Sequence, residues 1–359
     1  MLWILICQLL QVKDRIQLSK VNKCFHTTLH EPGTWTGELD FAQTKPTAQA
    51  LQRLGCRQTP TTSLICSHGS SLAMWLEAFN LGNLTTLDTS QCQSLTMQEL
   101  ESLSTLPSLT TWTLCAGISN HYYSFPVALA PSLHLRQIRR LIWRGHWECD
   151  NSTALALSHL FPKLTALHIT KADLSNLGFH FLGQCSDLTE LDVSDSLHLP
   201  RGERWHFIGQ QWPLLQSLTV RNYLSFAVPS EIHHLENSMF LHTLVVEDCS
   251  DGFHIPSLFL ALNALPCLRI FKYKTKRHFP VTAFKSFAIP GLKELHLHNS
   301  PTHLSWKMFR ILGRQAQLGL CNLQFLRVPF PRPFNSQGLL AATSLQKNLS
   351  NKLSIEYAS

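Results

Sequence analysis

Charged residues are scarce in this chain of 359 residues: Asp, Glu, Lys and Arg together make up 15% of it, against about a quarter of an average soluble protein. No run of Lys and Arg exceeds two residues, and acidic residues are interspersed among the basic ones. The formal net charge of +7, with nineteen His counted as neutral, is therefore spread thinly. This composition argues against bulk binding of nucleic acid, which needs a dense patch of cations.

The usual local signatures of catalysis are also missing. The sequence contains no phosphate-binding glycine loop, no H-E-x-x-H and no G-x-S-x-G. No local motif therefore indicates nucleotide binding, zinc-protease activity or hydrolase activity. We therefore expect a protein that is not an enzyme and has no cofactor. The enzyme-class alternative is a hydrolase whose triad is assembled from distant residues, because nineteen His and many Ser and Asp always allow one to be nominated.

Cysteine pairs and long apolar runs are lacking as well. The eleven Cys are scattered singly, with no C-x-x-C, and the chain has no convincing secretory signal. Met1 to Leu10 is apolar, but it is about half the length that spans a bilayer and has no basic residues ahead of it. We expect a cytoplasmic or nuclear protein without membrane contact.

One short apolar phrase recurs along the chain. It reads Leu164-Thr-Ala-Leu167-His-Ile169 at one place and Leu188-Thr-Glu-Leu191-Asp-Val193 at another. Its first position recurs at intervals of 24 to 31 residues, at Leu84, Leu109, Ile138, Leu164, Leu188, Leu215, Leu241, Leu268, Leu292 and Leu323. An L-x-x-L-x-L core at such a period resembles the leucine-rich repeat, in which each unit supplies one short strand and a return segment. The pattern predicts an α/β fold: a solenoid of about 10 to 12 repeats with a curved parallel sheet.

Prolines, glycines and polar stretches divide the chain into four segments. We expect a helical module over residues 1–41, a linker with irregular first repeats over 42–83, the solenoid over 84–335, and a cap or tail over 336–359. The alternating Leu39-Asp40-Phe41 predicts an extended segment at the end of the helical module, and apolar spacing predicts a return helix at 72–79. Prolines and glycines make the return legs 115–137 and 194–214 look looped, and the Pro-rich run 329–334 is expected to end the sheet. A final helix would pack through Leu339, Leu340, Leu345, Leu349 and Leu353.

The first segment carries a family resemblance. Leu10-Gln-Val-Lys-Asp14-Arg-Ile16-Gln-Leu18-Ser-Lys-Val21-Asn-Lys-Cys-Phe25-His26, followed by Leu29, Pro32, Trp35 and Leu39, resembles the latter two thirds of an F-box. In F-box proteins this module docks on the adaptor of a cullin-RING (SCF-type) ubiquitin ligase, and repeats behind it capture the target. The resemblance implies adaptor contacts through Leu9, Leu10, Val12, Ile16, Leu18, Val21 and Phe25. Two alternatives remain: the segment only caps the solenoid, or the chain is a scaffold or inhibitor without ligase coupling.

Residues between the apolar positions of a leucine-rich repeat point out of the concave face, where such proteins usually bind. The central exposed position carries Asp88, Thr113, Ile142, His168, Asp192, Thr219, Val245, Lys272, His296 and Arg327 in successive units. Acidic side chains therefore lie in the middle repeats, and basic side chains lie in the repeats towards the C-terminus. We expect target binding by Asp192, Glu247, Lys272, Lys274, His296, His298 and Arg327, with an acidic or phosphorylated segment suiting the cations. The alternative is that these charges only hydrate the face and pair across strands.

His296-x-His298 is the best candidate metal pair, because alternate strand residues face the same way. Equivalent positions of neighbouring repeats lie about 5 Å apart, which places Lys272, Lys274 and Arg327 beside the two imidazoles. Since zinc would meet cations there, we expect no metal site.

Overall fold

The computed structural model describes residues 10, 12–19, 37–42, 44, 46–47, 49, 51, 61–66, 70–92, 96–114, 133–144, 149–170, 172, 174–194, 204–221, 235, 237–247, 255–274, 281–298, 306–319, 322–328, 336–349 and 353–357. The chain forms two compact units. Unit 1 comprises Met1–Glu148 and Leu155–Ile169, and unit 2 comprises Cys149–Ala154 and Thr170–Ser359.

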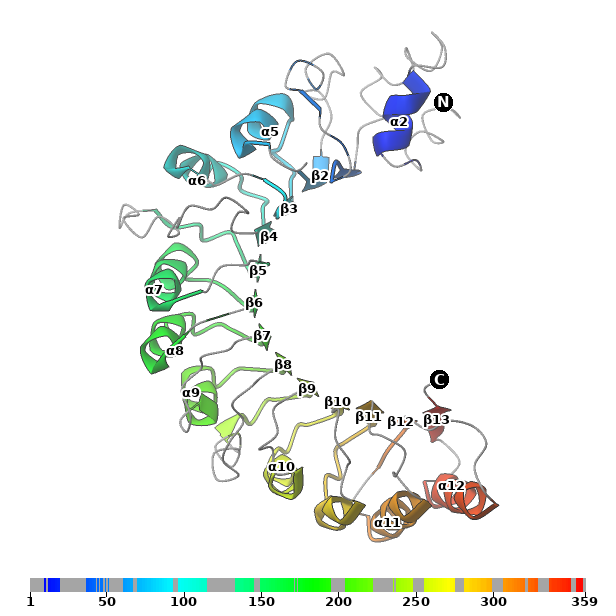
Figure 1. The fold of residues 1–359 in the computed structure, drawn as a ribbon. Helices are drawn as coiled ribbons and strands as arrows, with labels where there is room; N and C mark the ends of the chain where they lie inside the picture. Colours follow the sequence, from blue (N-terminus) through cyan, green and yellow to red (C-terminus); the bar gives the residue numbers. More distant parts are fainter. Residues whose placement is uncertain are drawn as a thin grey trace. The chain divides into compact units, whose positions relative to one another are not determined.

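In the described part of unit 1, six strands follow one another in the order of the sequence, each pairing in parallel with the next. They are β1 (Gly37–Asp40), β2 (Thr61–Ile65), β3 (Thr86–Thr89), β4 (Thr111–Leu114), β5 (Arg140–Trp143) and β6 (Ala166–Thr170). The helices are α2 (Val12–Ser19), α5 (Leu72–Ala78), α6 (Met97–Leu103) and α7 (Asn151–Leu160), the last beginning in unit 2. Helices α5 and α6 lie on one side of the strands (Figure 1).

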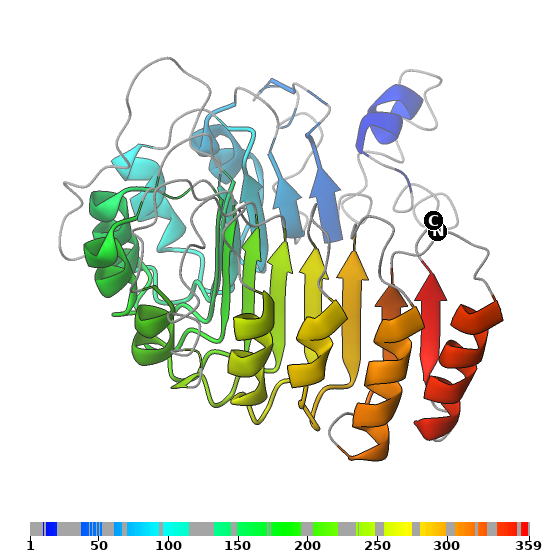
Figure 2. The same cartoon turned by 60° about the horizontal axis from the view of Figure 1, so that its bottom comes forward.

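Unit 2 repeats this plan with seven described strands, again paired in parallel in the order of the sequence. They are β7 (Glu190–Ser194), β8 (Ser217–Arg221), β9 (Thr243–Glu247), β10 (Ile270–Lys274), β11 (Glu294–His298), β12 (Phe325–Val328) and β13 (Ser354–Tyr357). The return legs contain α8 (Asn176–Leu182), α9 (Arg204–Gln211), α10 (Ile255–Asn263), the 3-10 helix η4 (Val281–Ser286), α11 (Trp306–Gln317) and α12 (Ser336–Asn348). Figure 2 shows α10, α11 and α12 beside the strands of this unit.

The recurring phrase builds the core of both units. Its apolar residues alternate along each strand with exposed ones, so they reach the same side of the sheet, where the return legs cover them. The register stacks Leu64, Leu87, Trp112, Leu141 and Leu167 in unit 1, and Leu191, Leu218, Leu244, Phe271, Leu295 and Leu326 in unit 2. Each of these side chains is at most 1% exposed. Both units are thus stacks of leucine-rich repeats, and the predicted burial of Leu167, Leu191, Leu218 and Leu244 is confirmed.

Polar side chains join neighbouring return legs on the other side of the strands. Glu99, at the start of α6, accepts a hydrogen bond from the backbone N–H of Ala73 in α5 at 2.8 Å. Asn263 bonds the return leg that follows it through Ser286 O at 2.6 Å and the N–H of Ala288 at 2.9 Å. Asn348 donates to Gly313 O at 3.3 Å and so ties α12 to α11. The bridge from Glu99 satisfies a backbone N–H in the first turn of α5, which has no acceptor within its own helix.

The N-terminal segment ends in a strand. We predicted a helical module over 1–41 that leads into an extended segment at Leu39-Asp40-Phe41, and residues 37–40 form strand β1, which pairs with β2. The reason is local alternation: Leu39 and Phe41 are fully buried while Asp40 between them is exposed. Only α2 represents the expected helices among the described residues of this segment.

Two further departures concern return legs. The leg 194–214, predicted to be looped, contains helix α9, because Ile208 and Trp212 stand four residues apart and both are buried. The array was predicted to end after Val328, yet α12 leads to β13, which pairs with β12. In α12 and the turn after it, Leu345, Leu349 and Leu353 are buried as expected, whereas Leu339 and Leu340 are exposed. The helix predicted at 72–79 is confirmed as α5.

Candidate binding face

The exposed face of the strands in unit 2 consists of three rows of side chains, which we call the strand face of unit 2. The first row is Glu190, Ser217, Thr243, Ile270, Glu294, Phe325 and Ser354. The central row is Asp192, Thr219, Val245, Lys272, His296, Arg327 and Glu356, and the last row is Ser194, Arg221, Glu247, Lys274 and His298. Neighbours in a row lie about 4.8 Å apart across the strands.

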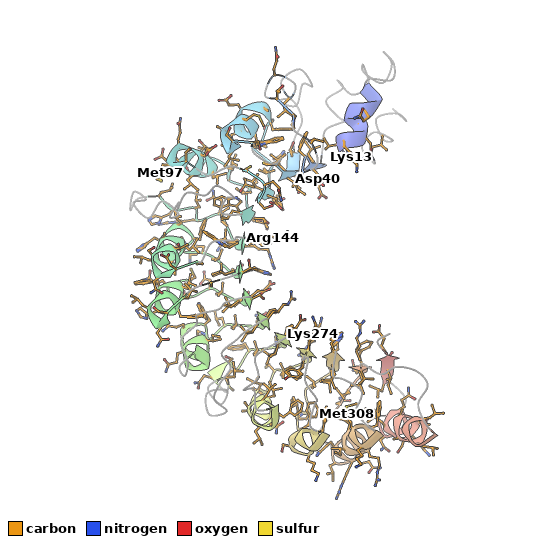
Figure 3. The ribbon with its side chains drawn as sticks, in the orientation of Figure 1. Lys13, Asp40, Met97, Arg144, Lys274 and Met308 are labelled. Carbon is orange, nitrogen blue, oxygen red and sulfur yellow. The ribbon has the colours of Figure 1, made fainter. Side chains whose placement is uncertain are left out.

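The register brings the cationic candidates together. His296 lies between Lys272 on β10 and Arg327 on β12, and His298 lies beside Lys274. Figure 3 labels Lys274 at the strand that carries it. All five side chains are half-buried, so each keeps a part of its surface open to a partner. This is the neighbourhood that repeat stacking predicts for the two His.

Acidic neighbours hold some of these groups in place. Glu294 contacts His296, with Oε2 3.1 Å from Nε2, and Glu356 pairs with Arg327 at 3.7 Å between Oε1 and Nη2. The Phe325 ring lies 5.0 Å from the His296 ring between centroids. In the described part of the chain, the buried Nε of Arg327 has no acceptor. The Arg327 guanidinium is therefore positioned by Glu356 and still has a hydrogen to donate.

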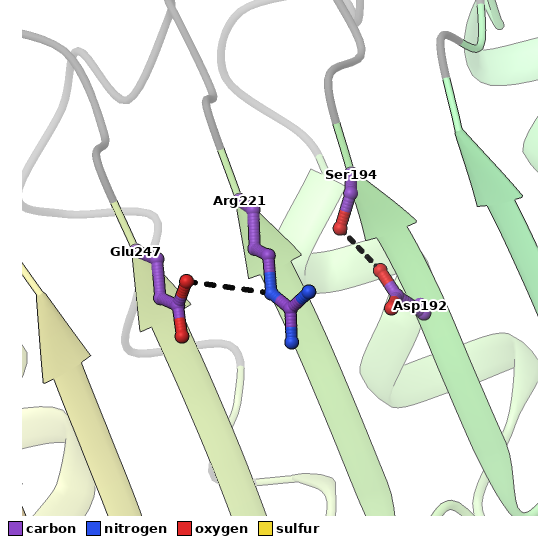
Figure 4. Close-up of polar contacts among 4 residues, drawn as sticks. All are labelled: Asp192, Ser194, Arg221 and Glu247. Carbon is purple, nitrogen blue, oxygen red and sulfur yellow. Dashed lines mark hydrogen bonds and ion pairs between the residues drawn. The ribbon is translucent and has the colours of Figure 1, made fainter.

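The candidate acids Asp192 and Glu247 each contact a polar side chain (Figure 4). Glu247 lies between Arg221 and Lys274 in the last row, and its Oε2 is 3.5 Å from Arg221 Nε. Asp192 accepts a short hydrogen bond from Ser194 Oγ. Arg221 was not among the predicted residues, although its position at the end of β8 matches that of Glu247 in β9. Around Glu247, the described side chains of the last row therefore alternate in charge, in the order Arg221, Glu247, Lys274.

The His298 imidazole has a perturbed proton affinity. Burial lowers its pKa from the ordinary value of 6.5, and the charges of Arg327, His296 and Lys274 lower it further, while Glu247 opposes them. His298 is consequently neutral at pH 7, with one ring nitrogen that donates and one that accepts. Among the described residues, no group of three His, Cys, Asp or Glu is arranged to hold a metal ion.

The adaptor-binding candidates lie in or near α2. Val12 is buried, at 2% exposure, and Leu10 is half-buried. Ile16 and Leu18 belong to α2, but their side chains are outside the described part of the structure. Leu9, Val21 and Phe25 also lie outside the described residues. No helix in the described ranges has both the length and the apolarity to cross a bilayer.

A second group of cations, on unit 1, was missed by the sequence analysis. Arg140 is the first residue of β5 and Arg144 directly follows the strand, and Arg140 Nη1 is 3.0 Å from Nε2 of His168 on β6. The sequence signal for this group is a lack of acidic residues: residues 102–147 contain four Arg and no Asp or Glu. These four Arg do not form a run, so the local excess of positive charge arises from the lack of acidic residues.

Comparisons with known proteins reveal similarity of structure but not of sequence. No protein-family model and no curated protein sequence matches this chain. Chains of solved structures do match it, 181 in number. One is an internalin (inlF) from Listeria monocytogenes str. 4b F2365, with 13% sequence identity and a TM-score of 0.49 over 90% of this chain and 78% of that chain.

Proposed function

We propose that this chain is the substrate-recognition subunit of a cullin-RING (SCF-type) ubiquitin ligase, acting in the cytoplasm or the nucleus. The strand face of unit 2 would hold the target protein, and the F-box-like segment around α2 would hold the ligase adaptor. Ubiquitin transfer would take place on other subunits, so the chain would need neither catalytic residues nor a cofactor.

The observation that carries the proposal is the alignment of exposed side chains on β10, β11 and β12. Lys272, His296 and Arg327 occupy one row, at the spacing of the strands. A leucine-rich-repeat stack is typically a non-catalytic scaffold for protein interaction, and the rigid sheet fixes these groups before a partner arrives. Pre-organised contacts cost less conformational entropy on binding than contacts made by mobile loops.

The chemistry of this row favours an acidic or phosphorylated target. Lys and Arg form charge-assisted hydrogen bonds with carboxylate and phosphate, and these bonds are stronger than neutral ones. Arg327 has a buried Nε without an acceptor in the described residues, and Lys272 faces the same side one strand beyond His296. An incoming anion would accept hydrogen bonds from the half-exposed guanidinium of Arg327 and ammonium of Lys272.

The adaptor half of the proposal is supported by the F-box resemblance of residues 10–39 and by the helix at Val12–Ser19. It is tested by co-purification of the full chain with an adaptor and a cullin from cells. Replacing Ile16, Val21 and Phe25 together by Asp should abolish co-purification while circular dichroism of the repeats stays unchanged. Lys13→Asp, on the exposed side of α2, is the matched control. Retained cullin binding by a soluble triple variant would refute the ligase assignment.

The target half is tested by charge reversal at Lys272 and Arg327. The double variant Lys272→Glu, Arg327→Glu should weaken capture of the physiological target at least tenfold, and added salt should weaken wild-type capture. Arg314→Glu, an exposed position on α11, makes the same kind of charge change on the helix side and should have no effect. Unchanged capture by the double variant would move the target site to the surroundings of Asp192 and Glu247.

A second candidate function is a scaffold or inhibitor that binds a partner without ligase coupling. The observation in its favour is that α2 is already packed within this chain: Val12 is 2% and Arg15 3% exposed, and Arg15 Nε donates to Leu10 O at 2.8 Å. Burial of this kind is expected of a terminal segment that caps a repeat stack. Target capture without cullin co-purification by the wild-type chain would select this candidate.

A further inference from the structure

In unit 2, the same tight turn precedes each of the strands β8 to β11. The backbone N–H of the first Leu of each repeat phrase bonds the carbonyl oxygen three residues before it, over 3.0–3.4 Å, which is the bond of a β-turn. In Figure 2 these turns lie at the ends of the strands opposite the arrowheads. The residues in the middle of the turns are exposed, apart from the half-buried Cys267. They are Pro213 and Leu214, Met239 and Phe240, Pro266 and Cys267, and Pro290 and Gly291.

Two neighbouring turns expose large apolar side chains. Leu214 is 47% exposed, Met239 53% and Phe240 51%. The turn of Leu214 lies beside that of Phe240, because Ser217 pairs with Thr243 three residues further along each strand. Single exposed apolar residues are normal on a protein surface, but an apolar surface shared by neighbouring repeats is typical of a binding site. Met and aromatic residues are also enriched at protein interfaces.

Cations continue this edge in the next two repeats. Arg269 and Lys293 are exposed and directly follow the first Leu of their phrases. The N–H of Arg269 bonds His242 O at 2.8 Å, and the N–H of Lys293 bonds Arg269 O at 2.8 Å, so the three residues stand side by side. In the part of the chain that the structure describes, no carboxylate pairs with either cationic side chain. Glu294, which follows Lys293, contacts His296 instead.

We propose that this edge of unit 2 binds an amphipathic helix of a protein partner. We call it the turn edge, and it consists of Leu214, Met239, Phe240, Arg269 and Lys293. One face of the partner helix carries apolar residues at positions i and i+4 and Asp or Glu at i+7 and i+11. The apolar pair covers the two apolar turns, and the carboxylates form charge-assisted hydrogen bonds with the two cations. The turn edge shares no residue with the strand face of unit 2, and it does not depend on the proposed ligase role.

The spacing of the repeats suits a helix that runs across the strands. Neighbouring repeats lie about 4.8 Å apart, so the four repeats of the turn edge span about 14.4 Å. Positions i to i+11 of an α-helix span about 16.5 Å, with one side chain of this face in each turn. Flexible Arg and Lys side chains can take up the difference of about 2 Å. An extended segment fits less well, because its side chains on one face lie about 6.6 Å apart and would be out of step by about 5 Å over four repeats.

An anionic membrane also fits the turn edge less well. Segments that bind anionic lipid typically gather about four to eight Lys and Arg, whereas the turn edge offers two. Its apolar and cationic groups also follow one another in a fixed order along the repeats. The face of a helix can match such an order, and a fluid lipid surface has none to match.

The experiment measures binding of fluorescein-labelled eighteen-residue helical peptides to the full chain by fluorescence anisotropy at low salt, where exposed charges are least screened. The test peptide carries Leu at i and i+4 and Glu at i+7 and i+11. One control peptide has the same composition with both Glu moved two positions along, which turns them by about 200° around the helix. Another has Gln for Glu. We expect the test peptide to bind at least fivefold more tightly than either control.

Variants assign the binding to residues. The double variant Arg269→Glu, Lys293→Glu should weaken binding of the test peptide at least tenfold and Phe240→Ser at least fivefold, with unchanged circular dichroism. Leu260→Ser, at a 50% exposed position of α10, and Lys272→Glu should stay within twofold, the latter separating this site from the proposed target site. The inference is overturned if no peptide binds, if both Glu arrangements bind equally, or if vesicles of phosphatidylcholine and phosphatidylserine bind more tightly and with the same dependence on Phe240.

Discussion

The bridge made by Glu99 gives a prediction whose size can be worked out from its bonds. Glu99 is buried, with only 5% of its surface exposed. Its Oε2 accepts from the N–H of Thr96 at 2.8 Å and from Thr96 Oγ1 at 3.0 Å, while Thr96 Oγ1 accepts from the N–H of Glu99 at 3.2 Å, which completes a capping box. Its Oε1 accepts from Ala73 N–H, in the first turn of the neighbouring helix α5. One carboxylate thus serves the N-termini of two helices.

Replacing Glu99 by Ala removes all of these acceptors. Loss of a cap costs about 0.5–2 kcal/mol, and loss of a hydrogen bond to a charged group costs about 1.5–3 kcal/mol. Because Ala73 and Thr96 are exposed residues, water replaces part of the lost bonding. We therefore expect the free energy of unfolding to fall by about 3 kcal/mol. Glu99→Gln keeps one oxygen acceptor and should cost about half as much.

Urea unfolding followed by circular dichroism measures the loss, and hydrogen exchange locates it. The amides of Ala73 and Thr96 should exchange faster in Glu99→Ala than in the wild type. Glu101→Ala is the matched control, because Glu101 is an exposed residue of the same helix and should change the free energy by less than about 0.5 kcal/mol. Equal effects of the two substitutions, or an unchanged Ala73 amide, would refute the bridging role.

Three other outcomes are expected. Leu244→Ala, at a fully buried position of β9, should lower the free energy of unfolding by about 2–5 kcal/mol, measured by urea unfolding; a loss below 1 kcal/mol would contradict the packed row. The pKa of His298 should lie below 6.5 when measured by NMR, and Arg327→Gln should raise that pKa by removing a nearby positive charge. Because the pKa of His298 is lower in the folded than in the unfolded chain, the unfolded chain binds more protons in this range. The contribution of His298 to stability should therefore fall as the pH drops below about 6.5. Burial raises the pKa of Cys185 to about 12, so mass spectrometry should find its thiol unalkylated by iodoacetamide at pH 8 until urea is added.

The repeat could be predicted from the sequence because its core repeats itself. Each L-x-x-L-x-L phrase places apolar side chains on one side of a strand, and ten such phrases at a nearly fixed period reinforce one another. The last strand, β13, was missed because it follows Leu353 without a full phrase. For β1, the alternation at Leu39-Asp40-Phe41 indicated an extended segment, but its pairing with β2 depends on the neighbouring strand, which a local pattern does not encode.

The rows of side chains in the candidate site could be predicted from the sequence, but the contacts between individual side chains could not. Repeat spacing alone placed His296 beside Lys272 and Arg327, and the register agrees. The contacts that modify these charges come from side chains one strand away or two residues apart, such as Glu356 with Arg327 and Glu294 with His296. Which of several neighbours a flexible side chain selects depends on distances of a few ångströms, and these are set by the three-dimensional packing.

The bridge from Asn348 to Gly313 couples the C-terminal repeats when mechanical force is applied to them. Tension applied beyond β13 first loads the pairing of β13 with β12 and then the contact of α12 with α11, where the side-chain amide bonds the two helices. Separating the last repeat therefore also strains the repeat before it. A repeat of 26 residues, the step from Leu215 to Leu241, releases at most about 90 Å of extended chain. Under tension we expect the stack to unfold in steps of about this length. The first step would involve the last two repeats together, because α11 and α12 are bonded to each other.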